Sequence, residues 1–300
     1  MKRGAVAAVL LACGGAVAHA PSAPSIELFK PPPDTHVLDA ALAPATVDVA
    51  LLDATGAPAP NESVFLAQIS DHPAPDVMGV SDARGHVTLA APSWAGGQAR
   101  AVCRKDGAIF FTEPFAIPAH GGVRVTLHAY ASSRKMDDAA VIFEMNTLVE
   151  PHAPGVSVTV GLRVYDYSRV AWKPDLALPL PAGATHFEGG VTSPATSLDV
   201  DAKDGVAHLA GTIAPGMHTI EMRFDLPAGS FRLTPPHLVR ARVVTWAGPA
   251  TRLEVAGFDA PAVDRTRFGA PALLTMREAA PGAVIGPLDI TATGLVDKQP

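Results

Sequence analysis

The segment GVSVTVGLRVYD, residues 155–166, carries an apolar side chain at every second position. These side chains are Val156, Val158, Val160, Leu162 and Val164. A helix cannot place them on one face, whereas a β-strand does, because successive side chains of a strand point to opposite faces of the sheet. The segment HTIEMRFDL, residues 218–226, repeats the pattern. This alternation predicts strands with one buried and one solvated face.

Proline and glycine, 29 and 26 of the 300 residues, are scattered through the chain. Proline breaks helices and cannot donate to a sheet ladder, so it separates short strands more readily than long helices. Hydrophobic residues make up 48% of the chain and charged residues 17%, which excludes disorder of the whole chain. The expected fold class is all-β, with two tandem antiparallel β-sandwich domains after a signal peptide and a Pro-rich linker.

Residues 1–20 have the organisation of a secretory signal peptide, in which Lys2 and Arg3 precede a short apolar stretch and a small-residue cleavage pattern ends at Ala18. A second interpretation is a lipoprotein, because LLAC resembles a lipobox whose Cys13 becomes acylated. No later run approaches the ~20 apolar residues that span a bilayer. We expect a soluble periplasmic or secreted protein first, an acylated lipoprotein second, and a membrane protein truncated before a C-terminal helix third.

The remaining chain divides into four segments by composition and periodicity. They are a Pro-rich linker at 21–42, a first sandwich at 43–131, a second sandwich at 137–258, and C-terminal strands with a tail at 259–300. The charged segment SSRKMDD, residues 132–138, interrupts both period-2 patterns and is the expected hinge between the sandwiches.

Residues 46–128 contain about seven short apolar runs joined by turns, the pattern of a small immunoglobulin-like sandwich. In GVRVTLHAY, residues 122–130, alternation predicts an antiparallel strand with one buried face. The side chains expected on its other, polar face are Arg124, Thr126 and His128. The stretches DATGAPAP at 53–60 and DARG at 82–85 predict tight turns, because Gly permits positive φ and Asp bonds nearby backbone amides.

The order VDVALLDATGAPAPNESVFL, GVSDARGHVTLAAP and QARAVCRKDG resembles the carboxypeptidase regulatory-like, or transthyretin-like, β-sandwich. In that family the first strand leads through a D-t-G-p-p turn into the second, and a later D-x-x-G turn leads into another strand. The resemblance implies a non-catalytic accessory module. The second unit is similar, more weakly, to a sandwich of unassigned activity in bacterial envelope proteins that carry this domain.

Once the signal peptide is removed, Cys103 is the one remaining cysteine, so no internal disulfide is expected. Cys103 shares the period-2 face of Ala99 and Ala101. This placement predicts a small buried side chain rather than a reactive thiol.

The segment DVDAKDG, residues 199–205, resembles a calcium loop through Asp199, Asp201 and Asp204. However, Lys203 stands at one ligand position, and Gly211 stands where a bidentate Glu is required. The KDG sequence between two short apolar runs instead predicts a β-hairpin.

Five aromatic side chains are candidates for a platform that stacks on sugars: Trp94, Trp172, Trp246, Tyr165 and Tyr167. Each tryptophan lies at the expected end of a strand. Tryptophans at strand ends more often plug the open end of a sandwich, which is the favoured interpretation.

The net charge is −6 and no Lys/Arg cluster occurs. The chain therefore lacks the basic surface that a nucleic-acid-binding protein needs. No HExxH, GxSxG, phosphate-loop, CxxC or dinucleotide-binding pattern occurs. The carboxylate pair Asp137 and Asp138 opens an expected strand. We therefore expect no enzyme, no catalytic, cofactor-binding or metal-binding residues and no cofactor, although a catalytic site assembled from distant residues stays open.

These features predict an exported non-enzymatic protein that acts as an interaction or spacer module of the cell envelope. Its expected partner is a protein or polysaccharide of the envelope. The alternative is a carbohydrate-binding module or an accessory subunit of an extracytoplasmic hydrolase.

Overall fold

The computed structural model describes residues 29–70, 76–191, 197–265 and 269–297. Strands account for 59% of these described residues. No α-helix occurs in these ranges, where the helical element is the single 3₁₀ turn η1 at Pro92–Trp94. The expected all-β sandwich fold class is confirmed. The predicted signal peptide, its cleavage site and Cys13 lie outside the described residues.

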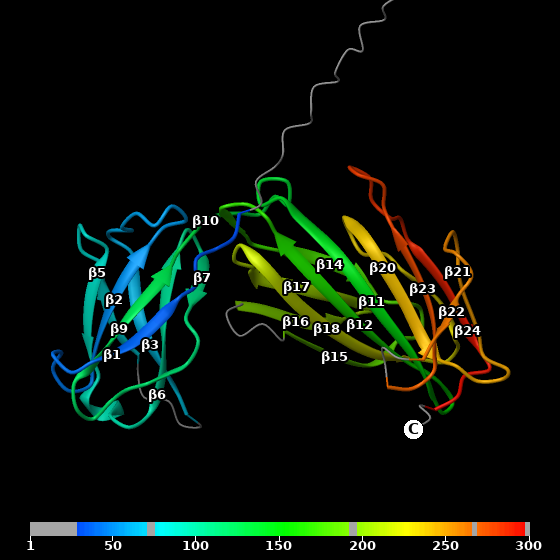
Figure 1. The fold of residues 1–300 in the computed structure, drawn as a ribbon, viewed down its shortest axis with the longest axis horizontal. Coiled ribbons are helices and arrows are strands. Elements are labelled where there is room, and N and C mark those ends of the chain that lie inside the picture. The colour runs from blue at the N-terminus through cyan, green and yellow to red at the C-terminus, as the bar shows by residue number, and fades with distance from the viewer. Residues whose placement is uncertain (1–28, 71–75, 192–196, 266–268, 298–300) are drawn as a thin grey trace, which may run out of the picture.

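An N-terminal lobe contains strands β1 to β9 (Figure 1). One sheet has the order β1-β9-β2-β5, and the other has the order β4-β3-β6-β7 with β8 paired to β6. The strands are β1 Thr35–Asp39, β2 Thr46–Leu52, β3 Ser63–Ile69, β4 Val77–Val80, β5 His86–Ala90, β6 Gln98–Lys105, β7 Ala108–Phe111, β8 Phe115–Ala116 and β9 Gly122–His128. The inner faces of the two sheets enclose one hydrophobic core.

A C-terminal lobe is built on a seven-stranded sheet of order β15-β18-β12-β11-β20-β23-β22. Two three-stranded sheets, β14-β17-β16 and β19-β24-β21, supply side chains to the same core. The first sheet comprises β11 Val141–His152, β12 Gly155–Asp166, β15 Thr185–Val191, β18 Gly216–Leu226, β20 Leu238–Trp246, β22 Ala262–Asp264 and β23 Ala272–Glu278. The other strands are β14 Asp175–Pro179, β16 Ser197–Lys203, β17 Val206–Thr212, β19 Ser230–Leu233, β21 Arg252–Val255 and β24 Leu288–Thr293.

The alternating segments form strands as predicted. Strands β12 and β18 pair antiparallel at the centre of the large sheet, and every predicted inward residue of β12 is at most 4% exposed. Polar neighbours such as Arg163 and Arg223 point to the outer face, where they are exposed. Side-chain burial, rather than backbone propensity alone, therefore fixes the register of this pair.

The tight turns predicted at 53–60 and 82–85 also contain the expected Asp hydrogen bonds. The Asp53 carboxylate accepts hydrogen bonds from the backbone amides of Thr55 and Ala57. The Asp82 carboxylate accepts hydrogen bonds from the amides of Arg84 and His86. Each carboxylate thus satisfies backbone donors that the turn leaves unpaired.

Part of the expected linker is a strand. Within residues 21–42, β1 pairs antiparallel with β9 from Thr35 to Asp39. Its side chains gain little burial, since Val37 and Leu38 are 63% and 72% exposed. Main-chain pairing to the open edge of β9 forms this strand, so it carries no period-2 signal in the sequence.

The expected antiparallel pairing holds for most strand pairs, but three pairs are parallel. Strand β2 pairs parallel with β9, and β11 pairs parallel with β20. The third parallel pair joins β10, Ala131–Ser133, to β13, Val170–Trp172. Alternation indicates which face of a strand is buried but not the direction of its partner, so these pairings are set by the global topology.

The expected C-terminal strands of segment 259–300 complete the second lobe in the described residues. Strand β23 pairs with β20 in the seven-stranded sheet, and β22 pairs with β23. Strand β24 lies between β19 and β21 and adds Leu288 and Ile290 to the core.

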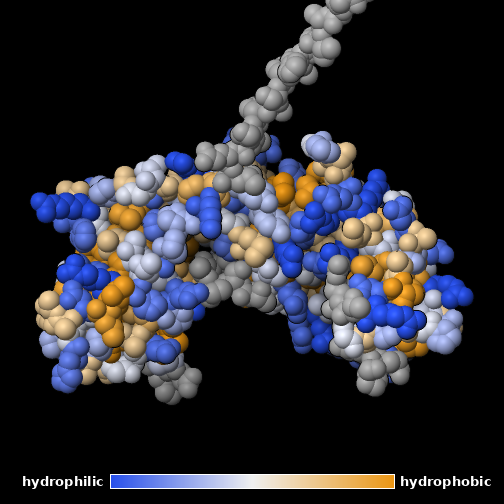
Figure 2. Space-filling model, viewed as in Figure 1, coloured by the Kyte–Doolittle hydropathy of each residue, from blue (hydrophilic) through white to orange (hydrophobic). Residues whose placement is uncertain are grey.

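Paired backbone joins the two lobes at the start of the expected hinge, residues 132–138. Strand β10 begins this segment and pairs with β13. Within β13, Ala171 belongs to the core of the N-terminal lobe, and Trp172 belongs to the core of the C-terminal lobe. The space-filling view shows a notch between the lobes on the side away from this joint (Figure 2). The division into two independently folding domains stays a prediction.

Further hydrogen bonds cross the joint. The amide of Ile109 donates to Thr212 Oγ1 at 3.0 Å, and the Lys173 ammonium donates to the Asp106 carbonyl oxygen. On the N-terminal side, the amide of Phe29 donates to the carbonyl oxygen of Tyr167 at 3.2 Å. The lobes are therefore held together by contacts from several separate segments.

Candidate functional site

A cavity of about 290 Å³ lies where residues 31–34 meet the two lobes. It is lined by Pro31, Pro32, Pro33, Asp34, Phe110, Phe111, Glu113, His128, Tyr130, Ala214, Pro215 and His218. These residues come from the segment before β1, from β7 and β9 and the residues that follow each, and from the β17–β18 turn and the start of β18. We call this space the interlobe cavity.

Buried His128 and the more exposed Asp34 form a hydrogen-bonded pair at one wall of the interlobe cavity. Asp34 Oδ1 lies 2.9 Å from the backbone amide nitrogen of His128 and 2.8 Å from its ring Nδ1. His128 is 5% exposed although it lies on the predicted polar face of β9, so the expectation that this face is solvated is wrong at His128. The segment before β1 covers this end of β9, and the carboxylate of Asp34 compensates the loss of water around the ring.

Tyr130 stands at the centre of an aromatic group beside this pair. Its ring lies 5.7 Å from Phe110, 6.3 Å from Phe29 and 6.5 Å from the ring of His128. Burial raises the pKa of the Tyr130 hydroxyl, and the nearby carboxylates of Asp34 and Asp166 raise it further. The hydroxyl therefore stays protonated and is available as a hydrogen-bond donor.

Asp166 ends β12 and is completely buried. Its Oδ1 accepts hydrogen bonds from the amide and the hydroxyl of Ser168, both at 2.9 Å, whereas its Oδ2 makes no hydrogen bond. Burial raises the pKa of this carboxyl to about 7, against the lowering effect of the Ser168 bonds. A carboxyl of this kind is neutral under mildly acidic conditions and charged under basic ones.

His218 closes the cavity from the C-terminal lobe. Its Nε2 lies 2.8 Å from the carbonyl oxygen of Ala214, and the side chain is 7% exposed. Burial lowers the pKa of His218, although the carbonyl oxygens of Ala214 and Pro215 act in the opposite direction. The ring is therefore mainly neutral at neutral pH.

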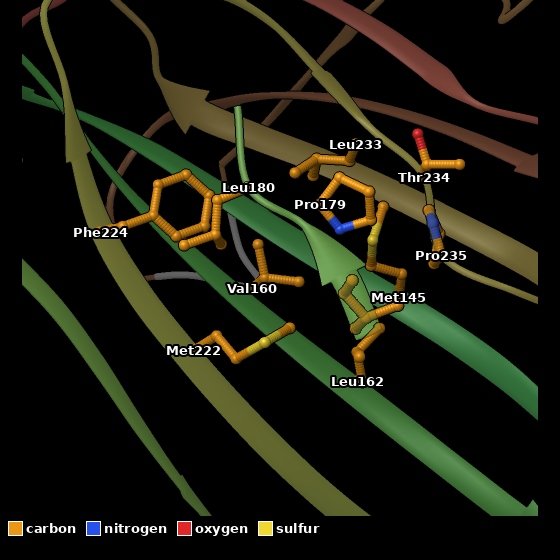
Figure 3. A pocket seen from close by; sticks show the side chains of 11 residues that line it. Met145, Val160, Leu162, Pro179, Leu180, Met222, Phe224, Leu233, Thr234 and Pro235 are labelled. Carbon is orange, nitrogen blue, oxygen red and sulfur yellow. The ribbon is translucent and has the colours of Figure 1, made fainter. Parts of the chain in front are cut away.

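A second cavity lies between the sheets of the C-terminal lobe (Figure 3). Figure 3 shows Met145, Val160 and Phe224 among the side chains around it, with Pro179 and Leu233 on the opposite sheets. Its volume is about 30 Å³, close to the space of one water molecule. This apolar space is a packing gap of the core and is too small for an organic ligand.

The three tryptophans of the suggested sugar platform are buried in separate places. Trp94, Trp172 and Trp246 are 3%, 2% and 6% exposed and belong to three different hydrophobic clusters. A platform that includes them is excluded, because all three are buried. That they plug the open ends of the sandwiches stays a prediction. Tyr165 and Tyr167 remain partly exposed, with their rings stacked at 5.6 Å.

The suggested calcium loop is a hairpin, as the KDG sequence predicts. Strands β16 and β17 pair antiparallel, and the turn between them has positive φ at Asp204 and Gly205. Across the described part of the chain, no three His, Cys, Asp or Glu side chains gather closely enough to hold a metal ion.

The remaining candidate residues have local structural roles. Cys103 is fully buried in β6, as predicted, and burial raises the pKa of its thiol to about 12. Asp137 and Asp138 lie in the turn before β11, where the Asp138 carboxylate accepts a hydrogen bond from the Ser133 hydroxyl. These carboxylates do not line the interlobe cavity.

The residues of the interlobe cavity carry no sequence motif. Asp34 and His128 are 94 positions apart, and Asp34 lies in a Pro-rich stretch that resembles a linker. One feature of the sequence could have indicated this cavity. His128 ends the alternation of β9 and directly precedes Ala129 and Tyr130, which are buried.

No family model and no curated protein matches this chain. Among solved structures, an M1 zinc metallopeptidase from Deinococcus radiodurans is similar over 50% of this chain, with 12% identity and a TM-score of 0.28. The chain spans 42% of the length of that enzyme.

Two other solved structures are similar over more of the chain. The match to the major pilin SpaD from Corynebacterium diphtheriae covers 81% of this chain and 80% of SpaD, with 12% identity and a TM-score of 0.22. Invasin, a bacterial integrin-binding protein, is covered over 56% and matches 86% of this chain, with 12% identity and a TM-score of 0.19. Scores this low carry no argument about function.

Proposed function

We propose that this chain is an exported, non-enzymatic β-sandwich protein that acts as an interaction or spacer module of the cell envelope. The observation that carries the proposal is the joint between the lobes. Adjacent residues of β13, Ala171 and Trp172, enter different cores, and hydrogen bonds from three further segments cross between the lobes. A joint built in this way supports a fixed separation of the two lobes, which is what a spacer requires.

The first unit supports the same proposal through its resemblance to the carboxypeptidase regulatory-like sandwich. The strand and turn motifs that carry the resemblance, at 47–66, 79–92 and 98–107, occupy β2 to β6 and their turns. Asp53 and Asp82 serve these turns by capping backbone amides. Such a unit is an accessory module in the family that it resembles.

The proposed location is the periplasm or the medium, with an acylated lipoprotein as the second proposal. It rests on the signal-like residues 1–20, in which Cys13 marks the lipoprotein alternative. Within the described ranges, no helix has the length and apolar composition needed to cross a membrane.

A carbohydrate-binding role is the second candidate, and the stacked pair Tyr165 and Tyr167 favours it. The pair lies at the end of β12 beside Glu144, whose carboxylate accepts a hydrogen bond from the Tyr165 hydroxyl at 3.1 Å. Half-exposed tyrosines next to charged groups suit contacts with the faces and hydroxyls of sugars.

Two screens test the proposal against these alternatives. We expect no turnover in a broad panel of peptidase and esterase substrates, and no reproducible signal on an array of glycans. Binding to one class of polysaccharide that is lost in Tyr165→Ala would favour the carbohydrate-binding role. Turnover abolished by one Asp or His substitution would contradict the non-enzymatic proposal.

A further inference from the structure

The wall of the interlobe cavity combines carboxylates with aromatic faces. Its ionisable residues are Asp34, Glu113, His128, Tyr130 and His218, and no Lys or Arg is among the residues that line it. Phe110 and Phe111 add two aromatic rings, and prolines form much of the rest. Such a wall presents negative charge and π-electron density, both of which attract cations.

Tyr130 gives the cavity a hydrogen-bonding group that the protein itself does not use. The side chain is 4% exposed and its ring lies near three other rings, but its hydroxyl makes no hydrogen bond with the described residues. The hydroxyl oxygen is not fully buried, so it can hydrogen-bond to water or to a ligand in the cavity. A ligand in the cavity would supply the missing partner or an ordered hydration shell.

The two carboxylates that line the cavity have different surroundings. Asp34 is bonded to the ring and the backbone of His128, whereas Glu113 is exposed and has no hydrogen-bond or ion-pair partner in the described part of the protein. Asp166 lies close enough to Tyr130 to affect its hydroxyl. Asp34 and Asp166 thus both act on the tyrosine hydroxyl, and Glu113 is free to pair with an incoming charge.

The two histidines could oppose a cation if they were charged. His128 already has Asp34 as its partner at 2.8 Å. His218 bonds to the carbonyl oxygen of Ala214 and is kept mainly neutral by burial. Neither ring therefore adds an uncompensated positive charge at neutral pH.

We propose that the interlobe cavity binds an organic cation, an alkylguanidinium or alkylammonium group, between the aromatic rings and the carboxylates of Asp34 and Glu113. A volume of about 290 Å³ suits one such group with a short apolar stem. The proposal deepens the interaction role proposed above, on which it rests, by naming the chemistry that one contact surface recognises. Two sources share this chemistry: a free small cation and an arginine or lysine side chain of a partner protein.

Calorimetric titration of the whole protein with butylguanidinium tests the binding. Butylurea is the control ligand, because it has nearly the same shape without the charge. We expect a dissociation constant of about millimolar order for the cation. Butylurea should bind at least about tenfold more weakly, since it cannot pair with the carboxylates.

Substitutions locate the site. Glu113→Gln and Tyr130→Phe remove one charge and one hydroxyl while keeping the shape of the side chain, and each should weaken binding about fivefold to tenfold. Glu221→Gln changes an exposed carboxylate on β18 that does not line the cavity, and it should leave affinity unchanged. Far-UV circular dichroism checks that all three variants fold.

The peptide acetyl-Gly-Arg-Gly-amide separates the two sources. Tighter binding of the peptide than of butylguanidinium would assign the cavity to a partner's side chain, and weaker binding would assign it to a free cation. The proposal is overturned if neither cation binds, if butylurea binds as tightly, or if Glu113→Gln and Tyr130→Phe keep full affinity. Such a failure would leave the non-enzymatic role to be decided separately by the turnover and glycan screens.

Discussion

Replacing Trp172 by alanine is expected to lower the free energy of unfolding by about 3–5 kcal/mol. Trp172 is 2% exposed, and its ring packs edge-on against Phe143 with centroids 5.9 Å apart. Its indole nitrogen donates to the carbonyl oxygen of Arg134. Alanine would leave a cavity in the core of the C-terminal lobe at the point where β13 connects the two lobes.

Urea denaturation followed by far-UV circular dichroism measures this loss without depending on tryptophan fluorescence. Trp172→Phe is the matched control, because it keeps an aromatic contact with Phe143 and removes the indole hydrogen bond. We expect the control to lose clearly less stability than the alanine variant. A loss below about 1 kcal/mol for Trp172→Ala would show that this residue does not hold the core.

Asp166→Asn is expected to change how stability depends on pH. Burial raises the pKa of Asp166 in the folded protein from 3.8 to about 7, so the folded state favours the protonated carboxyl. The stability that this group contributes is fully present below pH 3.8 and is lost as the pH rises through about 7. Asparagine cannot ionise, so the variant does not undergo this loss.

Between about pH 4 and pH 8, the free energy of unfolding of the parent protein should therefore fall by a few kcal/mol more than that of Asp166→Asn. The asparagine oxygen can still accept the two hydrogen bonds from Ser168, so the local turn is kept. Urea denaturation of both proteins across this pH range gives the difference directly. Parallel curves would show that Asp166 is not neutralised by burial.

Much of the fold could be predicted because its information is local. The strict alternation of residues 155–166 has one solution, a strand with one buried face, and β12 has this form. The KDG turns at 105–107 and 203–205 need positive φ, which Asp and Gly tolerate, and both adopt it. These features depend on neighbours a few residues away.

The joint and the interlobe cavity could not be predicted, because their information is not local. Nothing in the sequence around Ala171 indicates that it enters the core of the other lobe. The burial of His128 depends on Asp34, which is 94 positions away. Asp166 occupies the next inward position after Val164 in β12. Its burial depends on where β12 ends in the assembled fold.

The central claim, that two β lobes are held at a fixed separation, is tested most directly by electron spin resonance distance measurement between them. Spin labels at Arg84→Cys and Glu254→Cys would occupy exposed positions, one in each lobe, in a protein that also carries Cys13→Ser. Cys103 can stay, because its thiol is fully buried and has a pKa raised to about 12. We predict one narrow distance distribution, whereas a broad or bimodal distribution would contradict a rigid spacer.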